Sequence, residues 1–295
     1  MAKAIERKYF NNVHYILDED KRVVILKNEF HNELLGDNKW TSFKKIGGST
    51  IAEVLETDSF KSQFSAFCHI ARLKMPVLQK KYVNAGVAIE PKIFSAFSKE
   101  ITNAYGNKFL VKHFEAADYD YDFFKGKDKV FGGVPDGELV NTKNPLLNQV
   151  LEAKTVNFSK YTSWIQQNDK GEFINVPVAY KKQAQLYAHL MNLKKYIIIA
   201  TFLEDDKGDY VNPQDYPILE RKNYTFSFNV NPHEVEEDIN TVRKWYKKYT
   251  ETGVSPQYNP SIDKDQVEYL RCSSQKEWEE LLNKWKAIGK ADADA

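Results

Sequence analysis

The sequence predicts an α/β (α+β) fold in which helices flank a central mixed β-sheet, preceded by an N-terminal β-hairpin. Three observations support this fold class. Residues 133–154 fit two strands joined by a turn, an amphipathic helix over 177–193 leads into the continuous apolar run 196–203, and residues 223–230 alternate between polar and apolar side chains. A strand, a helix and a buried strand in this order make a crossover unit of a sheet.

The remaining elements follow from the spacing of apolar residues along the chain. Alternation over 13–27 indicates the N-terminal hairpin. Apolar residues at helical spacing predict helices over five further stretches: 49–55, 59–82, 86–97, 232–250 and 275–287. Residues 156–176 have no firm pattern and are expected to form a loop, whose aromatic side chains either stack unpaired bases or anchor the loop in the core.

Length and composition fit a cytoplasmic globular protein. The 295 residues can bury a substantial core, and no apolar run approaches the roughly 20 residues of a membrane helix. The first eight residues lack the apolar segment of a secretory signal. With only Cys68 and Cys272, we expect no four-cysteine iron–sulfur cluster and no cysteine-only zinc site. The net charge of +1 means that phosphate contacts require a local groove lined with lysine.

Two acidic residues come together if the strands within 133–154 pair about a turn centred on Asn144. Asp136 then lies opposite Glu152, with their Cβ atoms roughly 5 Å apart. Two carboxylates at that distance repel each other unless a proton or a cation lies between them. Mg²⁺ suits the pair, since it takes one or two protein carboxylates and completes its shell with water and phosphate oxygens. The pair therefore predicts a metal site.

Lys154 shares one face of its strand with Glu152, because alternate residues of a strand point to the same side. A lysine there can hold a water or, as the neutral amine, deprotonate it, and its ammonium can neutralise charge in a phosphorane-like transition state. Together with Asp136, these residues indicate metal-assisted phosphodiester hydrolysis. The alternative is a solvated ion pair at a strand edge, which contributes little to stability.

The helix over 177–193 carries further candidates. Gln183 and Tyr187 are four residues apart, so they lie on one side of it. Gln183 can orient a water or a phosphate oxygen, and Tyr187 can contact DNA or brace Lys154. Lys182 precedes them and suits a phosphate. The alternative is an ordinary amphipathic helix.

Two helix starts carry the last candidates. Ser49 fits an N-cap, and Lys45, Gly48 and Ser49 could together hold a phosphate, because backbone N–H groups at a helix start bind anions. Glu90 lies one turn beyond Gly86 and could complete the metal site. The alternatives are a capped helix without a ligand and a glutamate placed favourably near a helix start.

These motifs together resemble the PD-(D/E)XK nuclease superfamily, and within it the lambda-exonuclease-like or YqaJ-type viral recombinase branch. Pro135-Asp136 and Glu152-Ala153-Lys154 are similar to its signature. Residues 183–187 resemble its Gln-x-x-x-Tyr element, residues 45–52 its serine segment, and residues 86–90 its Gly-x-x-x-Glu helix. The resemblance covers about residues 40–205. The arginine that usually precedes the serine segment is missing, and lysines stand there instead.

The resemblance implies a site and a reaction. Asp136, Glu152 and the Ala153 carbonyl would ligate Mg²⁺, for which Mn²⁺ could substitute, and Glu90 would assist. Lys154 would activate water, and Gln183 and Tyr187 would position it. The expected catalytic residues are thus Asp136, Glu152, Lys154, Gln183 and Tyr187. The expected metal ligands are Glu90, Asp136, Glu152 and the Ala153 carbonyl. The expected enzyme is a phage-type DNA exonuclease acting on duplex ends for recombination, with 5′ to 3′ polarity.

The resemblance also implies partners, and the patterns along the chain suggest a domain division. We expect double-stranded DNA ends as substrate, a single-strand annealing protein as a partner and a homo-oligomer such as a ring-shaped trimer, with no membrane partner. Residues 1–35 are expected to be a β-hairpin appendage, 36–230 the nuclease core and 231–295 a helical extension packed on that core. Two alternatives stay open: an endonuclease of restriction, repair or CRISPR-adaptation type, and a catalytically silent binding relative.

Overall fold

The structure, a computed structural model, describes residues 6–295 and divides into two compact units. The sheet unit comprises Gly47–Ser49 and Lys81–Glu237. The terminal unit comprises the described part of Met1–Ile46 together with Thr50–Lys80 and Asp238–Ala295. The first five residues, which enter the expectation about a secretory signal, lie outside the described part. No helix in the described part is long and apolar enough to cross a membrane.

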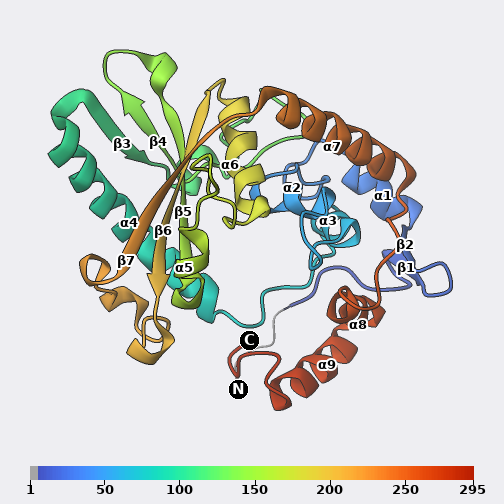
Figure 1. The fold of residues 1–295 in the computed structure, drawn as a ribbon. Coiled ribbons are helices and arrows are strands. Elements are labelled where there is room, and N and C mark those ends of the chain that lie inside the picture. The colour runs from blue at the N-terminus through green and yellow to red at the C-terminus, as the bar shows by residue number, and fades with distance from the viewer. Residues whose placement is uncertain (1–5) are drawn as a thin grey trace. The chain divides into compact units, whose positions relative to one another are not determined.

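A five-stranded mixed sheet forms the centre of the sheet unit (Figure 1). Its strands follow the order β3-β4-β5-β6-β7, and only β5 and β6 run parallel to each other. The strands are β3 Phe109–His113, β4 Gly137–Asn141, β5 Gln149–Asn157, β6 Lys195–Leu203 and β7 Lys222–Asn229. The parallel pair is joined through helix α6, Val178–Leu190. The predicted mixed sheet and its crossover unit are confirmed.

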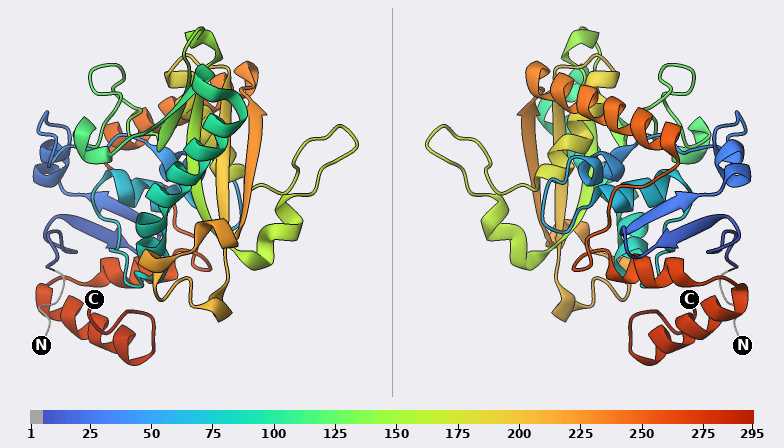
Figure 2. Two further views of the ribbon diagram at one scale, coloured as in Figure 1. Left: turned by 90° about the vertical axis from the view of Figure 1, so that its left-hand side faces the viewer. Right: turned by 90° about the vertical axis from the view of Figure 1, so that its right-hand side faces the viewer.

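Helices cover both faces of this sheet (Figure 2). Helix α4, Lys81–Tyr105, packs its apolar side on Leu151 and Ala153 of β5. Helices α5, Tyr161–Trp164, and α6 pack on the opposite face. Eight of the nine residues of β6 are therefore buried, which is typical of a strand covered on both faces.

Two predicted helices have different bounds in the structure. The helix expected over 59–82 is restricted to α3, Gln63–Ile70, because Arg72 adopts the left-handed conformation at φ +61° and ends it. The helix expected over 86–97 extends in both directions to form α4. Helix α2, Gly48–Val54, already begins at Gly48, so Ser49 lies within its first turn and is not an N-cap.

The loop expected over 156–176 is partly helical. A 3-10 turn over Phe158–Lys160 leads into α5, and an isolated bridge pairs Gln167 with Phe173. Trp164 is buried in the core between the sheet and α6, where it makes edge contacts with Phe202 and Phe226. At this residue the core-anchoring alternative is confirmed.

The terminal unit contains the predicted hairpin and most of the C-terminal helices. Strands β1, Tyr15–Asp18, and β2, Val23–Leu26, pair antiparallel. The helices of the terminal unit are α1 Asn28–Leu34, α3, α8 Lys264–Arg271 and α9 Gln275–Ala287, together with most of α2 and most of α7 Pro232–Thr252. The two ends of the chain are tied together here, because the Arg7 guanidinium donates to the Tyr269 carbonyl and to the Tyr15 hydroxyl, the latter at 2.6 Å.

Candidate active site

Strands β4 and β5 place the two predicted carboxylates side by side. Gly137 pairs with Leu151 and Leu139 with Gln149, so the register predicted from a turn centred on Asn144 is confirmed. Asp136 directly precedes β4, and its Oδ2 atom accepts a hydrogen bond of 2.8 Å from the Ala153 backbone N–H. This hydrogen bond fixes Asp136 beside the Glu152-Ala153-Lys154 segment of β5.

Glu152 is fully buried on β5 and is only partly satisfied. Its Oε1 atom accepts hydrogen bonds from the Lys154 ammonium and from the Gln183 amide. Its Oε2 atom is buried and has no hydrogen-bond partner among residues 6–295. A buried carboxylate oxygen left in this state is costly unless a ligand satisfies it.

Burial raises the pKa of both carboxyl groups, and repulsion by Asp136 adds to the rise for Glu152. For Asp136, burial raises the pKa, while the Lys154 charge and the Ala153 hydrogen bond oppose that rise. For Glu152, burial and the Asp136 charge raise the pKa, and Lys154 opposes them. Both carboxyl groups therefore take up a proton more readily than exposed carboxyl groups do, as expected where two acidic side chains are brought together away from water.

Lys154 is held as a cation. Burial alone would lower the pKa of its ammonium, but the Glu152 and Asp136 carboxylates raise the pKa above its ordinary value. The ammonium also lies 5.0 Å from the centroid of the Tyr180 ring, whose face attracts cations. Its side chain is mostly buried, so this charge is screened little by solvent.

Glu90 approaches the same group from helix α4. Its carboxyl pKa is raised by burial and by the Asp136 charge, which shows that the two groups interact. His113, at the end of β3, lies 2.9 Å from Glu90 through Nε2 and stacks on Phe94 at 4.3 Å between ring centroids. His113 was not predicted as a site residue, because no motif in the sequence marks the short strand β3 that carries it. Its pairing with Gly137, next to Asp136, is the signal that the structure supplies.

Gln183 and Tyr187 lie one turn apart on α6, as predicted, and serve different parts of the site. Gln183 donates to Glu152, whereas the Tyr187 hydroxyl accepts a hydrogen bond of 2.9 Å from the Gly48 backbone N–H. The same hydroxyl crowds Gly133, which has φ +95° and where an added Cβ would lie 2.6 Å from it. Only glycine fits that position without rearrangement.

The four predicted phosphate-binding residues do not form one cluster as the residues around Glu152 do. Gly48 lies next to the residues around Glu152, since a Cβ at that position would lie 3.0 Å from the Gln183 amide nitrogen. Ser49 is exposed and lies next to Gly48 in the chain. Lys182 forms an ion pair of 2.6 Å with Glu234 and is largely buried. Lys45 belongs to the terminal unit, so its relation to the site remains a prediction.

Comparison with known families identifies the chain. The model of the YqaJ-like viral recombinase domain matches residues 39–194, which are 156 of the 295 residues. The chain belongs to this family. The predicted relationship to the YqaJ-type viral recombinases is confirmed.

Two mycoplasma proteins are similar to this YqaJ-like chain over most of its length. "Uncharacterized protein MG373" of Mycoplasma genitalium is 26% identical over 251 residues, which cover 74% of this chain and 85% of that protein. Its homolog in Mycoplasma pneumoniae is 24% identical over 263 residues, covering 79% of this chain and 89% of that protein.

Solved structures of exonucleases are also similar to the YqaJ-like chain. LHK-Exo in complex with dAMP is 13% identical and covers 81% of this chain and 97% of that chain, at a TM-score of 0.49. LHK-Exo is an alkaline exonuclease from Laribacter hongkongensis. A phage-related exonuclease from Haemophilus somnus 129PT is 14% identical and covers 70% of this chain and 94% of that chain, at a TM-score of 0.46.

The YqaJ-type site has the donor atoms that a hard divalent cation takes. No group of three or more His, Cys, Asp or Glu side chains is arranged to enclose a metal ion within residues 6–295. Two carboxylates and the Ala153 carbonyl on adjacent strands nevertheless match a cation that takes few protein ligands and keeps its water. The unsatisfied Oε2 atom of Glu152 and the raised carboxyl pKa values both fit such an ion.

Proposed function

We propose that the protein is a metal-dependent DNA exonuclease that hydrolyses phosphodiester bonds at duplex ends, in the 5′ to 3′ direction, for recombination. One observation carries the proposal. Asp136 and Lys154 lie half-buried beside the fully buried Glu152, and one carboxylate oxygen of Glu152 lacks a hydrogen-bond partner within the described residues. This arrangement is unfavourable by itself and becomes favourable with a divalent cation and a phosphate.

Asp136, Glu152 and the Ala153 carbonyl would hold Mg²⁺ or Mn²⁺, and Glu90 would assist from α4. When bound, such a cation polarises a phosphodiester and makes its water more acidic. The hydrogen bond from the Ala153 N–H to Asp136 keeps that carboxylate beside Glu152 before any ligand arrives. The contact of Glu90 with His113 fixes the direction from which Glu90 approaches.

Lys154 contributes positive charge close to the reacting phosphate. Because the two carboxylates raise the pKa of its ammonium, Lys154 is protonated at neutral pH. In that form it can hold the attacking water through its oxygen and stabilise the negative charge that develops on the phosphate oxygens. Its burial strengthens both interactions, since the surroundings screen them little.

Gln183 and Tyr187 act as positioning residues. The Gln183 amide donates to Glu152 and so orients its carboxylate, leaving Oε2 directed away from that contact. The Tyr187 hydroxyl holds the Gly48 backbone, and the glycine at position 133 allows that close approach. Gly48, Ser49 and Lys182 are proposed to contact the DNA backbone near this point, and Lys45 is proposed to contact it from the terminal unit.

A cleavage assay tests the proposal. The substrate is a linear duplex labelled separately at each 5′ and 3′ end, incubated with Mg²⁺, Mn²⁺ or Ca²⁺. We expect mononucleotide release from the 5′ ends with Mg²⁺ and Mn²⁺ and none after chelation. Cutting of covalently closed circular DNA at a similar rate would instead support an endonuclease, and no Mg²⁺-dependent cleavage of any duplex would contradict the proposal.

The proposed partners need separate measurements. Light scattering of the purified protein at several concentrations tests the homo-oligomer, for which a ring-shaped trimer is expected. Co-purification with a single-strand annealing protein tests the recombination role, because an exonuclease that exposes single strands needs a partner to pair them.

A further inference from the structure

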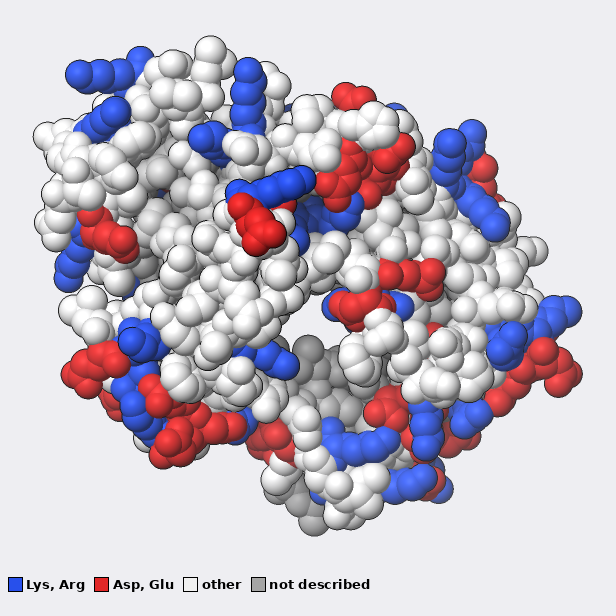
Figure 3. Space-filling view, viewed as in Figure 1, with Lys and Arg blue, Asp and Glu red and all other residues white. Residues whose placement is uncertain are grey.

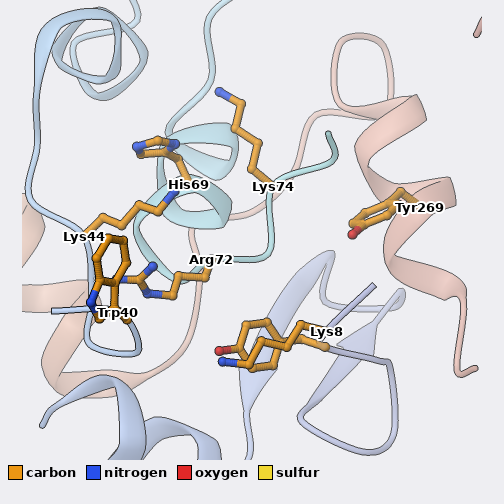
Figure 4. A pocket seen from close by; sticks show the side chains of 8 residues that line it. Lys8, Trp40, Lys44, His69, Arg72, Lys74 and Tyr269 are labelled. Carbon is orange, nitrogen blue, oxygen red and sulfur yellow. The ribbon is translucent and has the colours of Figure 1, made fainter. Parts of the chain in front are cut away.

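A cavity of about 260 Å³ in the terminal unit is lined mainly by cationic and aromatic side chains. Its lining comes from four segments of the chain and consists of Lys8, Tyr9, Trp40, Lys44, His69, Arg72, Lys74 and Tyr269 (Figure 4). We call this cavity the basic pocket. On the face of the molecule shown in Figure 3, acidic and basic side chains are interspersed, so a pocket lined by four cations and no carboxylate is a local feature.

The positive charge of the basic pocket is only partly offset. Lys74 forms an ion pair of 2.6 Å with Glu53. The Arg72 guanidinium instead donates to two backbone carbonyls, those of Ser42 and Lys39, both at 2.7 Å, which use its N–H groups without neutralising its charge. Glu33 acts on Arg72 only through its charge, and this raises the pKa of the guanidinium slightly against the larger effect of burial.

Lys44 has no hydrogen bond or ion pair through its ammonium within residues 6–295. Partial desolvation in the basic pocket, followed by the charges of Arg72 and Lys74, lowers the pKa of Lys44. The same three cations, after burial, lower the pKa of His69 to about 4, so its imidazole is neutral at pH 7. An anion in this place would relieve the repulsion among the cations.

A buried hydroxyl in the basic pocket also lacks a partner. Tyr9 is only 6% exposed, and its hydroxyl forms no hydrogen bond with any described residue. Buried hydroxyl groups are normally paired, so this one marks a position where a ligand oxygen would be accepted. Arg72, which also lines the basic pocket, adopts a left-handed backbone conformation at φ +61° that favours glycine.

The rim of the basic pocket is open enough for a strand. Trp40 is 68% exposed, and Lys44 and Lys8 are exposed beside it. An exposed indole next to cations is typical of a surface on which a base stacks while its phosphate is neutralised. An extended chain could pass across this rim, whereas an enclosed cavity would admit only an end group.

We infer that the basic pocket binds an internucleotide phosphate of a nucleic-acid strand through Lys44, Arg72 and the Tyr9 hydroxyl, with the neighbouring base on Trp40. The inference rests on the proposed function for the identity of the strand as DNA. Phosphate binding itself does not require cleavage. The basic pocket would thus supply a contact to the substrate outside the group of residues around Asp136.

The test is binding of a labelled single-stranded oligonucleotide with a 5′-hydroxyl end to the full chain, in EDTA so that no cleavage occurs, over a series of salt concentrations. Lys44→Gln should weaken binding about tenfold at low salt and reduce the slope of log affinity against log salt by roughly 0.7, the value for one single-strand phosphate. Lys276→Gln is the matched control, because Lys276 belongs to the same unit and its side chain is 85% exposed.

Tyr9→Phe separates binding from folding. This change removes only the unpaired hydroxyl, so thermal stability should be unchanged or higher, while oligonucleotide affinity should fall about fivefold. Inorganic phosphate should compete for the wild-type protein and much less for Lys44→Gln.

Two results would overturn the inference: binding by Lys44→Gln and Tyr9→Phe with wild-type affinity and salt slope, or dependence on Lys44 only when the strand carries a 5′-phosphate. Loss of nuclease activity is a separate outcome, because these measurements contain no divalent cation and do not use cleavage as a readout.

Discussion

The candidate active site brings negatively charged groups together, whereas the basic pocket brings positively charged groups together. In the sheet unit, the buried Glu152 and the half-buried Asp136 share one ammonium, that of Lys154. In the terminal unit, four cations line one cavity, and one of them, Lys74, forms an ion pair with Glu53. Each place also contains a buried oxygen without a partner, Glu152 Oε2 in one and the Tyr9 hydroxyl in the other. Crowded like charges and an unsatisfied group together indicate a missing ligand of opposite charge.

The two places differ in how far the charges are removed from water. Glu152 is fully buried on a strand covered on both faces, whereas Lys44 and Lys8 lie at an exposed rim. Electrostatic effects are larger where solvent does not screen them. Substitutions in the active site should therefore have large effects on both chemistry and stability, and substitutions in the basic pocket should have smaller effects that depend on salt.

The largest effect is expected for Asp136→Asn. Nuclease activity should fall by a factor on the order of 10⁴ or more, because a metal ligand is lost. The metal-free protein should become more stable by about 1 kcal/mol, since one of two repelling buried charges disappears. Activity assays and thermal unfolding in EDTA measure the two effects. Glu138→Gln, on the same strand and paired with Asn148, is the control and should change neither.

Lys154→Met should reduce activity by about 10² to 10³ and destabilise the metal-free protein, because the buried carboxylates lose their counter-charge. Since both carboxyl pKa values are raised in the folded state, the folded protein binds more protons than the unfolded one above about pH 4. Stability should therefore fall as pH rises, by about 2 kcal/mol more in Lys154→Met than in wild type at pH 8.

Denaturant titrations at pH 5 and pH 8, with and without Mg²⁺, measure this difference. Lys112→Met, at an exposed lysine on β3, serves as control. An unchanged pH profile in Lys154→Met would show that the ammonium does not offset the carboxylates.

A smaller effect is expected for Gln183→Ala, which removes an orienting hydrogen bond and no charge. Activity should fall about tenfold, as for other residues that orient a metal ligand. Because Gln183 acts through Glu152, the apparent affinity for Mg²⁺ should weaken as well, and Gln183→Glu should not restore it. A decrease in activity with unchanged Mg²⁺ dependence would assign Gln183 to the substrate instead.

The sequence predicts the active site better than the basic pocket because the site depends on local pairing. The spacing about Asn144 fixes the partners of Asp136 and Glu152, and helical spacing fixes Gln183 against Tyr187. His113 could not be predicted in the same way, because it reaches the site from β3, which pairs with β4 and not with β5.

The basic pocket brings together segments far apart in the chain, and no local pattern predicts their contact. Tyr9, Lys44 and Tyr269 line one cavity although they belong to distant parts of the sequence. The bounds predicted for the helix over 59–82 were wrong for a related reason, since the helix spans only Gln63–Ile70. Arg72 ends α3 in a conformation that residue type alone does not indicate, and its side chain then lines the basic pocket.

The smallest effect concerns the pH dependence set by His69. Burial and the charges of Lys44, Lys74 and Arg72 lower its pKa to about 4, against 6.5 in the unfolded chain. The unfolded protein therefore binds the extra proton, and the free energy of unfolding should fall by about 1 kcal/mol or more as pH drops from 6.5 to 4. His69→Gln should flatten this part of the profile, whereas His233→Gln, at an 84% exposed side chain, should leave it unchanged. Inorganic phosphate should also flatten it in wild type, because a bound anion raises the pKa of His69; an unaltered profile would mean that phosphate does not enter the basic pocket.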